Sequence, residues 1–159
     1  MIKINLITMG KLKEKYLCDA VGEYSKRLSR FCRLEICEIE PVRLPEKPSR
    51  GEIDAALERE AELITKKILP ESTVIALCVE GKGMTSEDLA QKIKKLSDTG
   101  RSISLIIGSS YGLAESVKTI ADIRLSLSQM TFPHQLFRVM LLEQLYRAFK
   151  INEGSAYHK

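Results

Sequence analysis

The sequence predicts an α/β domain with a mostly parallel sheet and helices on both faces. Strand-like apolar runs and amphipathic helical stretches alternate along the chain, a pattern typical of parallel sheets. The run 73–79 is continuously apolar, which indicates a central strand covered on both sides, and 103–107 is another core strand. A length of 159 residues fits a single domain, 1–159, whose core needs no disulfide or metal.

The first half of the chain supplies two strands and two helices. We expect a strand at Ile2–Thr8, a helix at about Lys13–Arg30, a strand at Leu34–Glu40 and a helix at Glu52–Ile68. Apolar residues recur every three to four positions in the helices, which makes one apolar stripe on each. Three prolines between residues 41 and 51 exclude regular structure there, and a loop of that length is often functional.

The second half repeats the alternation. We expect strands at Thr73–Val79, Ile103–Ile107 and Ile123–Leu127, with helices from about Thr85 to Gly100 and from Pro133 onward. Thr85 precedes early acidic residues, a combination that favours a helix N-terminus. Proline is well placed in a first helical turn, where its missing N–H has no partner to lose.

The last helix is apolar on most sides. Only the sector with Glu143, Gln144 and Arg147 is clearly polar, and Arg138 is isolated opposite it. Such a helix must be covered on most sides, and a small domain has little mass for this. We therefore expect a homodimer, the commonest oligomer. A central helix buried within one chain is the alternative.

Composition narrows the function classes. Hydrophobic residues make up 44% and charged residues 29% of the chain, as in soluble globular proteins. There is no signal peptide and no apolar run of membrane-spanning length, so we expect a cytoplasmic protein with no membrane partner. Four cysteines without a CxxC pair and two histidines near the C-terminus predict no metal site.

The net charge of +4 is unevenly placed, because basic residues outnumber acidic ones clearly in residues 1–33. This basic region could contact phosphates. A solvated helix surface explains the same charges equally well, since few aromatic residues for base stacking lie among them.

Three strand ends stand out as candidate ligand-binding positions: Leu77, Gly108 and Leu127. In open parallel sheets ligands bind beyond the carboxyl ends of the strands. The run Gly108–Gly112 would let backbone amides approach a ligand, although a tight turn without a ligand is equally compatible. Dinucleotide and P-loop motifs are absent, and neither Ser109 nor Ser110 lies in a nucleophile elbow.

Several motifs together resemble one family along the whole chain. They are Ile107-Gly108 with Gly112-Leu113, Leu125-Ser-Leu-Ser128 with Thr131, Pro133 and His134, Glu143-Gln-Leu-Tyr-Arg-Ala148, Gly154 with Tyr157-His-Lys159, and the opening Gly10-Lys-Leu-Lys-Glu-Lys-Tyr16. The sequence is similar to the small SPOUT-class methyltransferases that methylate N3 of a pseudouridine in large-subunit ribosomal RNA.

The resemblance implies a homodimer with a deep C-terminal trefoil knot that binds S-adenosylmethionine within the knot. Matched to the motifs, the cofactor site comprises Leu77, Gly108, Leu127, Ser128, Gln129, Met130, Thr131 and Phe132. The family usually has a second glycine where this chain has Ser109. That difference bears on how closely the backbone approaches the cofactor.

Four residues are candidates for catalysis: His134, Arg147, Tyr157 and His158. Methyl transfer from a sulfonium depends mainly on alignment and needs no metal. The acceptor nitrogen must lose a proton, so we hypothesise that a histidine, or a water it positions, assists, while basic groups favour the anionic base. The resemblance implies that the C-terminal tail completes the site across the dimer. Helix capping by His134, an Arg147–Glu143 ion pair and a disordered tail are the structural alternatives.

An RNA partner agrees with the basic N-terminal region. A protein this small has little surface for reading sequence, so we expect a shaped target, an assembled ribosome, with the acceptor base turned outward. The alternative is a ribosome-associated RNA-binding module of the same fold that has lost catalysis. A transfer-RNA methyltransferase is a weaker third possibility, because those chains usually carry extra RNA-binding segments.

Overall fold

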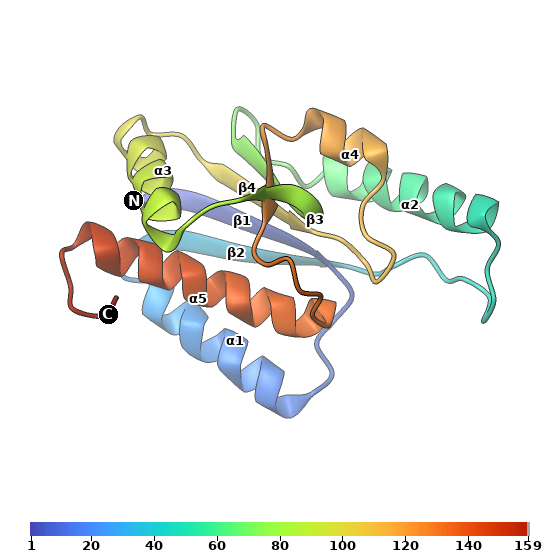
Figure 1. Ribbon diagram of the computed structural model, residues 1–159, viewed down its shortest axis with the longest axis horizontal. Coiled ribbons are helices and arrows are strands. Elements are labelled where there is room, and N and C mark those ends of the chain that lie inside the picture. The colour runs from blue at the N-terminus through green and yellow to red at the C-terminus, as the bar shows by residue number, and fades with distance from the viewer. Residues whose placement is uncertain (159) are drawn as a thin grey trace.

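Five parallel strands form the centre of the molecule (Figure 1). The computed structural model describes residues 1–158; Lys159, the last residue of the C-terminal motif, lies outside them. The strands are β1 (Ile2–Met9), β2 (Cys32–Ile39), β3 (Thr73–Gly83), β4 (Ile103–Ile107) and β5 (Ile123–Ser126). They follow the order β2-β1-β4-β3-β5, and each pairing within the described residues is parallel. The predicted parallel sheet is confirmed.

Helices cover both faces of this sheet, also as predicted (Figure 1). They are α1 (Lys15–Leu28), α2 (Arg50–Thr65), α3 (Ser86–Asp98), α4 (Glu115–Ile120) and α5 (His134–Asn152). Helices α1, α3 and α5 share one apolar cluster with the sheet, while α2 and α4 share a second cluster on the opposite face. Each residue of β4 is buried, because this strand lies between neighbours and under both layers.

The ends of the elements differ from the prediction by a few residues, for local reasons. Helix α2 begins at Arg50, since Ser49 accepts a hydrogen bond from the Glu52 amide and completes a capping box. Strand β3 continues to Gly83 rather than ending at Val79, because it pairs with β5 twice, with a shift of register between Leu77 and Lys82.

The continuation of β3 crosses β5 at very short range. A Cβ atom on Gly81 would lie 2.7 Å from the Leu125 carbonyl carbon, so only glycine permits this backbone contact. The crossing brings the chain after β5 beside the ends of β3 and β4.

Helix α5 packs between α1 and α3 on the sheet, and its own chain covers much of it. Leu141, Leu142 and Leu145 are fully buried, whereas Leu136 is exposed and Met140 half-buried. The single chain therefore covers the helix better than its apolar composition suggested, but leaves part of its outer face open.

The contacts of Arg138 explain why a charged residue lies on the apolar side of α5. Its side chain is 3% exposed and donates to Glu38 Oε2 at 2.8 Å and to the Gly10 carbonyl at 3.0 Å. A buried guanidinium needs such partners, since an unpaired charge in the interior is costly. Arg138 thus joins the start of α5 to the ends of β1 and β2.

Candidate functional site

The three predicted strand ends meet around one cavity of about 470 Å³. Its walls come from residues 77–80 after β3 pairs with β4, from 107–113 after β4, and from the chain between Ser126 and Phe137. Parallel strands bring their carboxyl ends to one edge of a sheet, which is why segments distant in sequence converge here.

The loop after β4 is tightly closed. A Cβ atom on Gly108 would lie 2.3 Å from the Gly112 carbonyl oxygen, so a larger residue cannot be accommodated. Gly112 has φ +89°, a left-handed conformation that favours glycine, and its amide donates to the Ser109 carbonyl at 2.8 Å. Both glycines are therefore needed to give this wall of the cavity its shape.

The segment after β5 is held by short-range hydrogen bonds of two serines. Ser126 Oγ donates to the Ser128 carbonyl at 2.9 Å, and the Met130 amide donates to Ser128 Oγ at 3.0 Å. Met130 is 73% and Phe132 37% exposed. Two large apolar side chains at the mouth of a cavity offer a surface for a flat apolar ligand.

The structure places most of the predicted cofactor residues on this cavity. Its lining includes Leu77, Gly108, Ser128, Met130, Thr131 and Phe132. Gln129 is not among the lining residues, and Leu127 lines a neighbouring cavity instead. The backbone direction at β5 decides this, because successive side chains alternate between the two sides of an extended chain.

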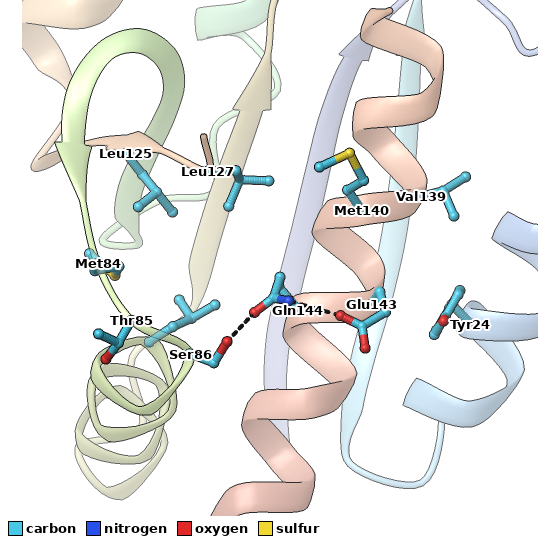
Figure 2. Close-up of a pocket in the computed structure, with 11 residues that line it drawn as sticks. Tyr24, Met84, Thr85, Ser86, Leu125, Leu127, Val139, Met140, Glu143 and Gln144 are labelled. Atoms are coloured by element: carbon cyan, nitrogen blue, oxygen red, sulfur yellow. Dashed lines mark hydrogen bonds between the residues drawn. The ribbon is translucent and has the colours of Figure 1, made fainter. Parts of the chain in front are cut away.

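The neighbouring cavity, of about 370 Å³, lies between α5, the start of α3 and the end of β5. Figure 2 shows Leu125 and Leu127 on one side of it and Val139 and Met140 on the other. Ser86 Oγ donates to Gln144 Oε1 at 2.7 Å and links α3 to α5 across it (Figure 2).

His134 begins α5 and lines the larger cavity. Burial and then the nearby Arg138 guanidinium lower its pKa below the ordinary value of 6.5. The imidazole is therefore neutral at neutral pH and able to accept a proton. No side-chain hydrogen bond caps the described start of α5, so the capping alternative has no support from this side chain.

The other three candidate catalytic residues gather around Glu143, farther along α5. Arg147 donates to Glu143 Oε1 from Nη2 at 2.6 Å, which realises the ion pair weighed from the sequence. The Tyr157 hydroxyl donates to Glu143 Oε1 at 3.3 Å, and the Arg147 guanidinium lies 4.9 Å from the Tyr157 ring centre. His158 Nδ1 is 3.4 Å from Arg147 Nη1. We call Glu143, Arg147, Tyr157 and His158 the tail cluster.

Electrostatics in the tail cluster follow from these contacts. The Glu143 carboxylate raises the pKa of Arg147, which stays fully charged. Burial, and then Glu143, raise the pKa of the Tyr157 hydroxyl above 10.0, so it remains a hydrogen-bond donor. His158 Nε2 lies 2.6 Å from Glu87 Oε1 at the start of α3, which anchors the tail.

Distance separates the tail cluster from the larger cavity within one chain. Arg147 is the thirteenth residue after His134 in α5, which at a rise of about 1.5 Å per residue is about 20 Å away. The structure therefore brings Arg147, Tyr157 and His158 together and leaves His134 apart from them. Sequence analysis gave Glu87 no role, because it lies 71 residues from its partner His158.

Comparison with known proteins bears on this arrangement. A family model described as "Predicted SPOUT methyltransferase" matches residues 2–158. The chain belongs to the SPOUT methyltransferase family.

Relatives within this family match along their full length. The ribosomal RNA large subunit methyltransferase H of Bifidobacterium adolescentis is 55% identical over 159 residues, which cover 99% of this chain and 100% of that protein. The protein of the same name from Clostridium botulinum is 50% identical with the same coverage. Both are therefore similar in overall length to this SPOUT methyltransferase.

A solved structure shares the fold at low sequence identity. A probable methyltransferase from Bordetella pertussis Tohama I has a TM-score of 0.56 and 12% identity, covering 92% of this chain and 94% of that one. At this identity the likeness concerns the SPOUT fold alone.

None of the helices within residues 1–158 is long and apolar enough to cross a membrane. Nor does any group of three metal-binding side chains come together in that part of the chain.

Proposed function

We propose that this SPOUT methyltransferase transfers a methyl group from S-adenosylmethionine to N3 of a pseudouridine in large-subunit ribosomal RNA. The observation that carries the proposal is the convergence of three strand ends on one cavity with neutral His134 at its edge. The names of the full-length relatives support the ribosomal substrate.

The cavity of about 470 Å³, which we call the donor cavity, fits the methyl donor in the chemistry of its lining. The Gly108–Gly112 turn leaves no room for a side chain at Gly108, because the loop closes there on its own backbone and forms a compact wall of the cavity. Met130 and Phe132 offer apolar contact for a flat purine, and Thr131 and Ser128 offer polar groups at its edge. S-adenosylmethionine would supply an activated methyl group on its sulfonium sulfur.

His134 supplies the proton acceptor in this proposal. A neutral imidazole, or a water that it positions, takes the proton from N3 of the acceptor base, which leaves the nitrogen anionic and nucleophilic. Positive charge near the base stabilises this anion, and Arg147 carries such a charge permanently.

A third cavity, of about 490 Å³, shares His134 with the donor cavity and supports an RNA acceptor. It lies at the ends of β1 and β2, and Lys11, Lys13 and Arg43 line it. Glu38 and Glu40 also line it, and Glu38 is paired with Arg138. Basic side chains beside the proton acceptor can hold phosphates of the strand that carries the base.

We also propose a homodimer, which the separation of the two groups of candidate residues supports. About 20 Å lies between His134 and Arg147 along α5, too far for one chain to apply both to one base. A second copy whose α5 packs in the opposite sense would bring its tail cluster to the donor cavity. The partly open outer face of α5, with Leu136 and Met140, is the surface available for this contact.

We also propose that the crossing of β3 over β5 belongs to the trefoil knot that the family resemblance implies. The contact of Gly81 with the backbone of Arg124 and Leu125 supports this, because it is a close crossing of two chain segments. The ribosomal substrate places the protein in the cytoplasm.

Transfer of labelled methyl groups tests the function. Ribosomes, free subunits and naked ribosomal RNA from a strain without this gene are incubated with labelled S-adenosylmethionine and the protein, and the labelled nucleotide is mapped. We expect label on one large-subunit pseudouridine, and none when the substrate carries uridine at that position. Donor binding without label in any substrate would favour the non-catalytic RNA-binding module.

A further inference from the structure

Two unsatisfied polar groups lie together behind the wall of the donor cavity. Among residues 1–158, four buried side-chain atoms lack a hydrogen-bond partner within the protein, and two of the four are Glu60 Oε2 and Ser109 Oγ. Glu60 is 4% exposed on α2, and Ser109 follows Gly108 in the loop after β4. Buried polar groups without partners are rare in native proteins and need an explanation.

The two side chains face each other. Burial raises the pKa of the Glu60 carboxyl group, and the Ser109 hydroxyl is the group that opposes this rise. Packing around the two side chains supports this proximity. Ala61 and Ile64 of α2 belong to the same apolar cluster as Leu113 and Ala114, which follow the loop. Ser109 lines the donor cavity, whereas Glu60 does not.

A carboxyl group at this position does not serve packing. The residues on the buried face of α2 around Glu60 are apolar, and a leucine of similar size would bury well among them. The Gly108–Gly112 loop, in contrast, is anchored in the described structure mainly by its own backbone, through the Gly112 amide bond to the Ser109 carbonyl. Glu60 is the acidic group within reach of the loop's inner side.

We propose that Glu60 is a positioning residue for the methyl donor: its carboxyl group holds Ser109, and through Ser109 the cavity wall, in the shape that binds the donor. This inference rests on the proposed function, in which the cavity holds S-adenosylmethionine. It also gives a role to Ser109, which stands where the family usually has a second glycine.

Donor binding and thermal stability, measured separately, test the proposal. Glu60→Leu should weaken binding of S-adenosylmethionine about tenfold in calorimetric titration, because Ser109 loses its partner. The same variant should keep or raise the melting temperature, since an apolar side chain replaces a buried acid. Glu60→Gln, which retains hydrogen-bonding atoms, should bind within about threefold of the original protein. Glu62→Leu is the matched control on the exposed side of α2 and should leave binding unchanged.

A double substitution tests whether Glu60 affects donor binding through Ser109. If Glu60 acts through Ser109, then Ser109→Ala costs a similar factor in binding, and Glu60→Leu with Ser109→Ala costs no more than either alone. Losses of donor affinity that multiply in the double variant would overturn the proposal. So would a Glu60→Leu variant that binds the donor as tightly as the original protein. If Glu60→Leu does not fold, Ser109→Ala carries the same expectation, and unchanged binding by it is equally decisive against Glu60.

The result is separable from the proposed function, because binding needs no RNA. A protein that binds the donor but leaves ribosomal RNA unlabelled contradicts the substrate and not the role of Glu60. A protein that does not bind the donor contradicts both.

Discussion

The two ends of α5 differ in chemistry although they belong to one helix. At its start, half-buried His134 is kept neutral and borders a cavity with apolar Met130 and Phe132 at its mouth. Farther along, the tail cluster of Glu143, Arg147, Tyr157 and His158 is held by ion pairs and hydrogen bonds. Each end has what the other lacks: one can hold a donor and accept a proton, the other can stabilise negative charge.

In the proposed function these two ends are the halves of one site, and a single chain keeps them apart. A rigid helix keeps the halves about 20 Å apart, since its hydrogen-bonded backbone does not shorten. Association of two copies is the direct way to join them. The predictions that follow test this division, from the largest expected effect to the smallest.

Complementation between inactive variants gives the largest effect. His134→Ala and Tyr157→Ala should each lower kcat about a hundredfold or more, through loss of the proton acceptor and of the tail cluster. Co-expressed, they should recover about a quarter of the original activity, because half of the dimers are mixed and each mixed dimer has one intact site. Methyl transfer to ribosomes measures this.

The matched control pairs His134→Ala with Gly108→Ala. Both changes lie in the donor half, so no mixed dimer has an intact site and no activity should return. Absence of recovery in the first mixture would show that each chain works alone, and recovery in this control would show that His134 and Gly108 do not belong to the same half of the site.

Distortion of the Gly108–Gly112 loop should have the next largest effect, on donor binding. Gly108→Ala places a Cβ atom 2.3 Å from the Gly112 carbonyl oxygen, so the backbone must move and donor binding should fall at least about a hundredfold. Gly22→Ala, in α1 with nothing within 4 Å, should leave binding unchanged and raise stability by about 0.5 to 1 kcal/mol. Calorimetric titration and thermal unfolding measure the two outcomes. Equal binding by both variants would remove Gly108 from the site.

The two arginines of α5 should differ in their contribution to stability. Arg138→Met leaves half-buried Glu38 and the Gly10 carbonyl unpaired, which should lower the free energy of unfolding by about 2 to 3 kcal/mol. Arg147→Met should cost under about 1 kcal/mol, because the Arg147 and Glu143 side chains are 25% and 20% exposed and water screens the pair. Urea unfolding of both variants compares them; a larger loss for Arg147→Met would contradict the assignment of Arg138 as the structural arginine.

The smallest effect is the pH dependence of His134. Its pKa is lowered in the folded state, so the neutral form is favoured there and its contribution to stability is complete above about pH 6.5. As the pH falls below this value, the unfolded chain takes up the proton first and the contribution is lost. Melting temperatures of the original protein and His134→Gln should therefore converge from pH 7.5 to 5. Divergence toward acid would reverse the sign and contradict a neutral His134.

Local patterns predicted a large part of this molecule. Strand β4 lies at the residues expected from its mostly apolar sequence, and α5 begins one residue after Pro133. Leu77 and Gly108, which the sequence predicted as candidate ligand positions, both line the larger cavity. These inferences succeed because side-chain periodicity reports which face of an element is buried, and because parallel sheets bind ligands at one edge.

Other features depend on contacts between distant segments. The strand order and the bond between His158 and Glu87 across 71 residues follow from no local pattern. Glu60 looks like an ordinary acidic residue of an amphipathic helix and is nevertheless buried against the donor loop.

The sequence by itself determined the fold class, the positions of the strands and helices, and the residue types available for chemistry. Periodicity and turn residues act over a few positions, so this information is local and can be read along the chain. Only the tertiary structure decided that His134 and the tail cluster lie at separate ends of α5 and that Glu60 stands behind Ser109. Such distances are set by how packed elements dock, and that depends on the whole core at once.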